Sequence, residues 1–141
     1  MRNLYRFFAL GAPERLFLLH CIAVVVVVRL ALSLKSHDKL RWRIAAMETS
    51  SPAGLHDLRL VSWGVTAAAR WIPHASCLTQ ALAGQYLLAR RGKASLVRIG
   101  VERNTGAELK AHAWLISGNR VVLGGPPSTL ANFTHLIDYG R

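Results

Sequence analysis

The chain has 141 residues, 52% of them hydrophobic, which is enough for one sizeable core but not for two. Eighteen Lys and Arg residues against seven Asp and Glu residues give a formal net charge of +11. This balance excludes an acidic disordered chain and favours a polyanionic partner. The excess is spread evenly, with a net +6 over residues 1–70 and +5 over residues 71–141. We therefore expect no nucleic-acid-binding arm and no nucleic-acid partner.

A long apolar run, LFLLHCIAVVVVVRLALSL, occupies residues 16–34. Its 19 residues suffice to cross a bilayer as a helix, but His20 and Arg29 interrupt it. An Arg inside a spanning helix costs roughly 2.5–3.5 kcal/mol. Basic residues lie on both sides of the run, and the residues after it make a poor signal-peptidase site. We therefore favour a buried helix over a membrane-surface or spanning segment, and either of these over a signal peptide.

Helix signals and breakers organise the first half of the chain. Residues 12–46 are predicted to be helical, because a proline and an acidic residue suit the first turn. The breakers at 48–54, ETSSPAG, place a boundary between an N-terminal helical segment, 1–54, and a core domain, 55–141. A second helix is predicted over 55–70, where apolar residues repeat along one face.

The second half begins with a well-signalled helix and continues as strands. Ser76 is a suitable N-cap, apolar residues follow at helical spacing, and Arg90-Arg91-Gly92 supplies a C-terminal stop. Strands are then predicted over 96–103, 108–116 and 120–124, separated by turn signals at 104–106 and 117–119. The sequence thus predicts an α+β fold, with this helix followed by a three-stranded antiparallel meander.

The two cysteines have different surroundings. Cys21 lies within the apolar run and is predicted to be a buried hydrophobic residue. Cys77 falls in the first turn of the helix after Ser76, where unpaired backbone N–H groups and the helix dipole stabilise a thiolate and an oxyanion. Because 56 positions separate them, we expect no disulfide framework and a reducing, cytoplasmic compartment.

His112 is the candidate partner of Cys77, because a thiol nucleophile needs an imidazole to take up and return its proton. On the alternation of the strand predicted over 108–116, His112 shares a face with Trp114. Two other interpretations stay open. In one, the cysteine and the histidine only pack. In the other, His74, Cys77 and His112 bind zinc, although a fourth ligand is missing.

Several motifs occur in order over residues 74–125. They are Cys77-Leu78-Thr79-Gln80-Ala81-Leu82-Ala83, Arg90-Arg91-Gly92, Ile99-Gly100-Val101 and Ala111-His112-Ala113-Trp114. Together they resemble the leader peptidases of lasso-peptide biosynthesis, a bacterial branch of the transglutaminase-like superfamily. The apolar, arginine-flanked N-terminal half is also similar to the stand-alone form of these enzymes.

The resemblance implies a transglutaminase-like (papain-like) cysteine peptidase, with Cys77 as nucleophile and His112 as general base and acid. The implied reaction removes the leader from a lasso-peptide precursor and frees the core N-terminus for macrolactam formation, without a cofactor. The implied partners are the precursor peptide, a small leader-recognition protein and an ATP-using lasso cyclase. The expected location is the cytoplasm, with peripheral membrane association as a further expectation.

The pattern of these peptidases places an acidic residue about a dozen positions after the histidine. If the hairpin closes at 117–120, the histidine lies opposite Gly125, or opposite Gly124 with a one-residue bulge. Both positions are glycine, so either a carbonyl, an amide or a water orients the imidazole, or another acid reaches it. The acidic candidates are Glu102, expected on the opposite sheet face, and Asp138, in the C-terminal tail.

Alternatives from other classes stay open. One is an acyl transferase, in which an amine resolves the thioester. Another is a non-catalytic scaffold, which the missing carboxylate favours. A third is a membrane protein anchored by residues 16–34. The basic segment 35–43 is either a solvated helix end or a docking site for an acidic peptide, an acidic protein or anionic lipid. Residues 124–127, GGPP, form a turn or, less favoured because no helix is predicted after them, a phosphate cradle.

Overall fold

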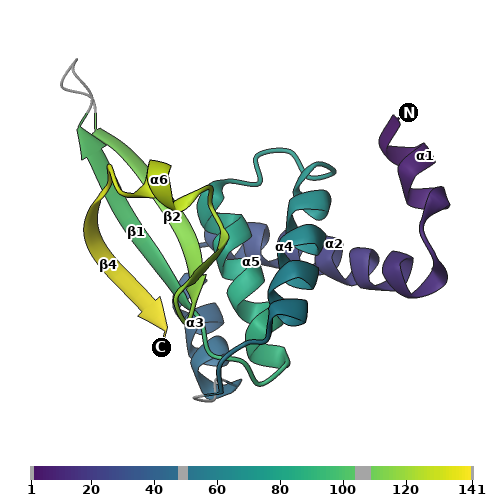
Figure 1. The fold of residues 1–141 in the computed structure, drawn as a ribbon, viewed down its shortest axis with the longest axis horizontal. Coiled ribbons are helices and arrows are strands. Elements are labelled where there is room, and N and C mark those ends of the chain that lie inside the picture. Colours follow the sequence, from purple (N-terminus) through teal and green to yellow (C-terminus); the bar gives the residue numbers. More distant parts are fainter. Residues whose placement is uncertain (1, 48–50, 104–108, 141) are drawn as a thin grey trace.

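The computed structural model describes residues 2–47, 51–103 and 109–140 (Figure 1). In chain order, the elements are α1 (Arg2–Ala9), α2 (Ala12–Ser33), α3 (His37–Met47), α4 (Leu55–Ala69), α5 (Cys77–Arg90), β1 (Leu96–Arg103), β2 (Leu109–Ser117), β3 (Arg120–Leu123), α6 (Pro127–Leu130) and β4 (Thr134–Gly140). This order confirms the α+β class. The predicted turn at 104–106 and part of the predicted break at 48–54 lie outside the described residues.

The strands form one antiparallel sheet in the order β3-β2-β1-β4, and α5 packs on one of its faces (Figure 1). That face carries Val97, Ala113 and Leu115, which are buried in the core. The predicted three-stranded meander is confirmed as β1, β2 and β3, and a fourth strand that was not predicted, β4, pairs with the free edge of β1. Residues 134–140 lack regular apolar alternation, so this strand depends on its partner rather than on a local signal.

The N-terminal helices differ from the prediction in two ways. The single helix expected over 12–46 is divided into α2 and α3, because Lys35 adopts the left-handed region with φ 55° and ends the first of them. In addition, α1 precedes α2 and was not predicted. The predicted helix over 55–70 is confirmed as α4.

The inner face of α2 joins the hydrophobic core, where it packs against α4 and α5. The buried residues on this face are Leu18, Cys21, Val24, Val25 and Val28. This packing explains how a run of five valines with low helix propensity stays helical. Cys21 is fully buried, as predicted, and burial raises the pKa of its thiol to about 12.

A single core collects apolar residues from both sides of position 54. At its centre, α5 is tied to the sheet by the buried amide of Gln85. Its Nε2 donates to the carbonyl of Tyr139 in β4 (2.8 Å) and to that of Ser95 before β1 (3.4 Å). Gln85 lies at helical spacing from apolar residues of α5, a pattern that gives no sign of its partners. Through these bonds α5 has a fixed position on the sheet.

Candidate active site

Cys77 is the first residue of α5 and is partly buried. The predicted cap is confirmed: Ser76 Oγ accepts from the backbone N–H of Thr79 at 3.2 Å. The N–H of Gln80 donates to the Ser76 carbonyl at 3.0 Å. Among the described residues, the backbone N–H groups of Cys77 and Leu78 have no acceptor. Two donors at the positive end of the helix are therefore free to hold an anion beside the thiol.

His112 lies near the start of β2, and its imidazole is held by a backbone carbonyl. The distance from His112 Nε2 to the Gly124 oxygen is 2.6 Å. A carbonyl oxygen only accepts, so Nε2 carries the proton of the neutral ring. The other nitrogen, Nδ1, then has the free lone pair and is the atom that can accept a proton.

Aromatic rings fix the orientation of this imidazole further. Its centroid is 6.0 Å from Trp114, in a stacked arrangement, and 5.4 Å from Phe133. Two glycines make room for the indole: at Gly100 a Cβ would come within 2.8 Å of Trp114 Cη2, and at Gly124 within 2.9 Å of Trp114 Cα. The packing of Trp114 and Phe133 around the imidazole thus depends on two positions, Gly100 and Gly124, at which no side chain fits.

Contacts between α5 and β2 place Cys77 and His112 at the same end of this pair of elements. Near their other ends, Ser117 Oγ donates to the carbonyl of Ala94, just after α5 (2.7 Å). Midway, Gly84 lies against Leu115 of β2. Cys77 lies seven residues before Gly84 along α5, and His112 lies three residues before Leu115 along β2. Each stretch is about 10 Å long, so the two residues lie at about the same level.

No hydrogen bond joins the thiol of Cys77 to the imidazole of His112 in the part of the chain that the structure describes. The alternation of β2 places His112 on the face of Trp114, opposite the face of Leu115 that α5 covers. The arrangement therefore provides a nucleophile at the start of α5 and an oriented imidazole at the same end of β2, but α5 and the imidazole lie on opposite faces of the sheet. Proton transfer between the two side chains therefore requires them to come closer when substrate binds.

The group that orients the imidazole is the Gly124 carbonyl, one of the alternatives that the sequence left open. Ser117 pairs with Arg120 as expected, but a bulge after Ile116 brings Leu115 opposite Leu123, where β3 ends. The predicted register required His112 to pair with Gly125 or Gly124, but neither glycine pairs with it in the β-ladder. The backbone turns away instead, with φ 113° at Gly124, and its carbonyl reaches the ring.

Neither acidic candidate binds the imidazole. Glu102 was expected on the sheet face opposite His112, and this prediction is wrong. Gly100 pairs with His112 and Glu102 pairs with Lys110, so Glu102 and His112 lie on the same face. In the described residues no hydrogen bond connects the two side chains. Asp138 has other partners, Arg98 and His135.

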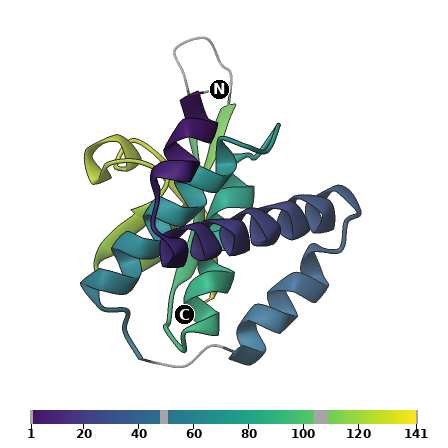
Figure 2. The same cartoon turned by 90° about the vertical axis from the view of Figure 1, so that its right-hand side faces the viewer.

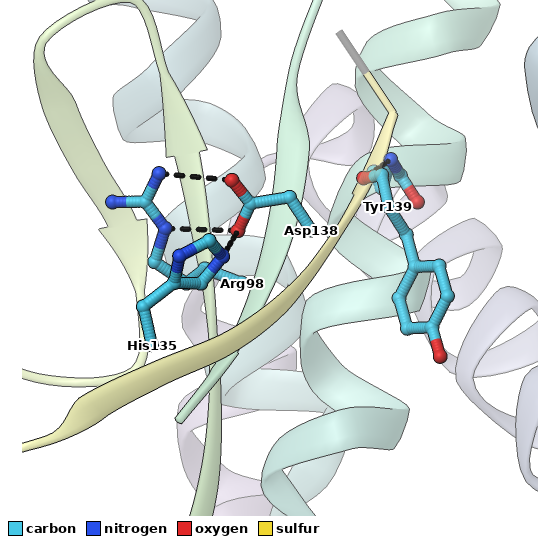
Figure 3. A network of polar contacts seen from close by, with 5 residues as sticks. Arg98, His135, Asp138 and Tyr139 are labelled. Carbon is cyan, nitrogen blue, oxygen red and sulfur yellow. Dashed lines mark hydrogen bonds and ion pairs between the residues drawn. The ribbon is translucent and has the colours of Figure 1, made fainter. Parts of the chain in front are cut away.

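Asp138 forms a bidentate ion pair with Arg98 across β4 and β1, with both N···O distances at 2.9 Å (Figure 3). His135 Nε2 lies 2.9 Å from the same carboxylate. The hydrogen bonds from Arg98 lower the pKa of the Asp138 carboxyl, and the nearby charges of Arg98 and His135 act in the same direction. This network fastens β4 to the sheet, on the face opposite Tyr139 (Figure 3).

Replacing Asp138 by Asn is expected to remove part of the loss of stability in acid. The folded pKa lies below the ordinary value of 3.8, so the carboxylate stabilises the fold above that value and loses this effect as the pH falls through the lower folded pKa. Melting temperatures measured by circular dichroism from about pH 2 to pH 7 should differ most near neutrality and converge in acid. Asp38→Asn, at an exposed carboxylate, provides the background, and parallel curves for wild type and Asp138→Asn contradict the assignment.

A groove of about 790 Å³ lies between α4 and the segment from β3 to α6. Three cationic side chains line it, Arg59, Arg70 and Arg120, together with apolar surface that includes Trp63. No Asp or Glu lines it, and none of the three arginines pairs with an acid among the described residues. Gly125 forms part of its wall, so the groove begins one residue from the carbonyl that binds His112.

The alternative chemistries find no support in the geometry. Among the described residues, which include His74, Cys77 and His112, no group of three or more His, Cys, Asp or Glu could hold a metal ion. Contrary to expectation, a helix does follow the GGPP segment, but α6 has only four residues, from Pro127 to Leu130. The segment is a turn that leaves the sheet, and its first glycine, Gly124, makes room for Trp114 and binds His112 through its carbonyl.

A sequence profile described as the transglutaminase-like superfamily matches residues 23–138. The match begins inside α2, ends in β4 and includes both Cys77 and His112. No curated protein and no solved structure matches the chain.

Proposed function

The chain belongs to the transglutaminase-like superfamily, and from this premise we propose that it is a cysteine peptidase that removes the leader from a lasso-peptide precursor. Membership implies a cysteine-dependent enzyme, a hydrolase or an acyl transferase. The choice of the lasso branch is supported by the motif order from Cys77 through Arg90-Arg91-Gly92 to Ala111-His112-Ala113-Trp114.

In the first half of the proposed reaction, Cys77 Sγ attacks the carbonyl carbon at the junction of leader and core. His112 Nδ1 accepts the thiol proton, and the N–H groups of Cys77 and Leu78 stabilise the negative oxygen. The C–N bond then breaks, and the imidazolium gives its proton to the departing core amine. The leader remains on Cys77 as a thioester, and the core peptide leaves with a free N-terminus.

In the second half, water attacks the thioester carbon while His112 Nδ1 takes one of its protons. The C–S bond breaks, the imidazolium returns a proton to the sulfur, and the leader leaves with a new carboxylate. No cofactor enters either step. An acyl transferase would differ here alone, because an amine would replace the water.

The observation that carries this proposal is the hydrogen bond from His112 Nε2 to the Gly124 oxygen at 2.6 Å. It holds the ring in the tautomer whose Nδ1 is basic, which is the task of the missing carboxylate. A carbonyl has no negative charge, so it orients the imidazole but stabilises the imidazolium less than an aspartate does. This hydrogen bond supports an enzyme over the scaffold alternative, which rested on the missing carboxylate.

The proposed partners follow from the chemistry and the charge. A small leader-recognition protein delivers the precursor, and a cyclase uses the freed core amine to close the macrolactam. The net charge of +11 favours docking to acidic partners in the cytoplasm.

Reconstitution tests the proposed function. Purified protein, the leader-recognition protein and the precursor encoded beside it are incubated with and without a primary amine, and the products are identified by mass spectrometry. We expect one cleaved bond, a core with a free amine and a leader with a carboxylate, and no cleavage by Cys77→Ala. A leader that carries the added amine indicates an acyl transferase, and equal cleavage by Cys77→Ala contradicts a role for the thiol.

The arginine-lined groove is expected to bind the peptide beside the cleaved bond through acidic side chains. Replacing Arg59 and Arg120 together by Gln should raise KM by about tenfold and leave kcat within about twofold, because two exposed charge pairs of about 0.2–1 kcal/mol each are removed. Arg90→Gln, at an exposed arginine of α5, is the control. An unchanged KM, or a loss confined to kcat, contradicts this role for the groove.

A further inference from the structure

The outer face of α2 carries a continuous stripe of exposed apolar side chains. Its members are Leu16, Leu19, Val26, Val27 and Leu30, and it continues at Leu34, the C-cap residue just after the helix. Their spacing places them along one side of a helix. The only charged residue between the ends of the stripe is Arg29, which is partly buried and donates to Ser33 Oγ.

The rest of the domain does not cover this stripe. In Figure 2, α2 crosses the front of the molecule, and α4, α5 and the sheet lie behind it. The helix is long and apolar enough to cross a membrane, with a mean hydropathy of 2.5 in its best window, yet only 28% of that window is buried. It is therefore apolar on two sides, and only the inner side has a partner among the described residues.

Further apolar side chains are exposed on α1, the helix before α2. Helix α1 has no buried residue, and its side chains Leu4, Tyr5 and Phe8 are 51%, 86% and 65% exposed. Helical spacing places these three side chains on one side of this short helix and Arg2 and Arg6 on the other. We call the stripe together with Leu4, Tyr5 and Phe8 the α1–α2 surface.

Basic residues border the α1–α2 surface at both ends. Arg2 precedes it, Arg6 and Arg15 lie within its N-terminal half, and Lys35, Lys39 and Arg43 follow its C-terminal end. The acidic residues of the same helices are Glu14 and Asp38. An apolar surface bordered by cations matches a membrane whose headgroups are anionic and whose interior requires no specific hydrogen bonds.

We propose that the α1–α2 surface binds the surface of an anionic phospholipid bilayer, with α2 lying in the plane of the interface. A spanning orientation is disfavoured because the inner face of α2 holds Cys21, Val25 and Val28 in the core of the domain. A second copy of the chain is a poor partner because both copies carry a net charge of +11. An acidic protein fits the charge, but the stripe offers few polar groups to specify one.

Co-sedimentation with vesicles tests this proposal. Full-length protein is mixed with vesicles of phosphatidylglycerol and phosphatidylcholine, or of phosphatidylcholine alone, at about 0.1 M and about 1 M NaCl. We expect binding to the anionic vesicles, little binding to the neutral ones, and release at high salt or by alkaline carbonate. The double variant Leu16→Gln/Leu30→Gln should bind at least about tenfold more weakly, because two inserted leucines are lost.

Leu109→Gln/Leu136→Gln is the matched control, since these leucines are 65% and 60% exposed on the sheet. Far-ultraviolet circular dichroism checks that both double variants fold. The proposal is overturned if wild-type protein stays in the supernatant, if both double variants bind like wild type, or if neutral vesicles bind equally well. Resistance to carbonate indicates a spanning helix, and a vesicle-independent oligomer that the stripe variant disrupts indicates a protein interface; either result also overturns it.

Discussion

Replacing Cys77 by Ala is expected to lower the rate of leader cleavage by at least about 1,000-fold, and replacing His112 by Ala by a similar factor. The reason is that each residue is useful only with the other: an imidazole without a thiol has nothing to activate, and a thiol without an imidazole has no base. The double variant should therefore be about as slow as either single variant. Initial rates from mass spectrometry of the reconstituted reaction measure all three.

The comparison needs a matched cysteine and a matched histidine. Cys21→Ala tests whether the buried thiol contributes, and His56→Ala removes an exposed histidine of α4. Both should cleave at the wild-type rate once the folded fraction is taken into account. Additive effects of the Cys77 and His112 substitutions would mean that the two residues act independently, which contradicts the proposed mechanism.

Replacing Gly124 by Ala is expected to lower both stability and activity. A backbone φ of 113° costs a residue with a Cβ about 1–3 kcal/mol, and the new Cβ meets Trp114. Because the same residue supplies the carbonyl that orients His112, cleavage by the folded fraction should also fall by about 100-fold, the lower range of general acid–base effects. Urea denaturation and cleavage rates measure the two losses separately.

Gly125→Ala is the control for this prediction. Gly125 has almost the same φ, 114°, but a Cβ there would meet nothing within 4 Å. It should lose a similar amount of stability to backbone strain, and its folded fraction should keep most of the kcat, since Gly125 lines the groove but does not bind His112. Equal loss of activity in the two variants would show that strain of the segment, and not the contact with Trp114 and His112, is responsible.

The parts of the fold encoded by local signals could be predicted. Ser76 caps α5 through its own side chain, and Gly92 follows the last turn with a φ of 69°, so both ends of that helix are readable from residue types. The hairpin of β2 and β3 has its turn at Gly118, which has φ 59°. These signals are sufficient because the interactions span only a few residues.

Other features depend on contacts between distant segments and could not be predicted. Strand β4 exists because the edge of β1 accepts it and Gln85 holds its backbone. The wrong face for Glu102 arose from the register of β1 against β2, which the turn residues in the sequence at 104–106 do not specify. Lys35 ends α2 in the left-handed region, although lysine is not a residue that favours it.

Only part of the candidate site could be predicted from the sequence. Cys77 and His112 are marked by their residue types, whereas a backbone carbonyl that orients an imidazole has no side-chain signature. The nearest signal was the glycine pair at 124–125, which stands where an acid was expected. Two glycines allow the backbone to turn and a carbonyl to approach the ring, so an absent carboxylate was itself informative.

The most direct test of the account is to identify the residue that a leader peptide acylates. A peptide with the leader sequence and a thiol-reactive C-terminal group is incubated with wild-type protein and with His112→Ala, and the modified residue is mapped by tandem mass spectrometry. The account predicts modification of Cys77, slower in the variant, with Cys21 unmodified because it is fully buried and its thiol pKa is raised to about 12. Modification of Cys21, or no modification of either cysteine, would contradict the assignment of Cys77 as the nucleophile.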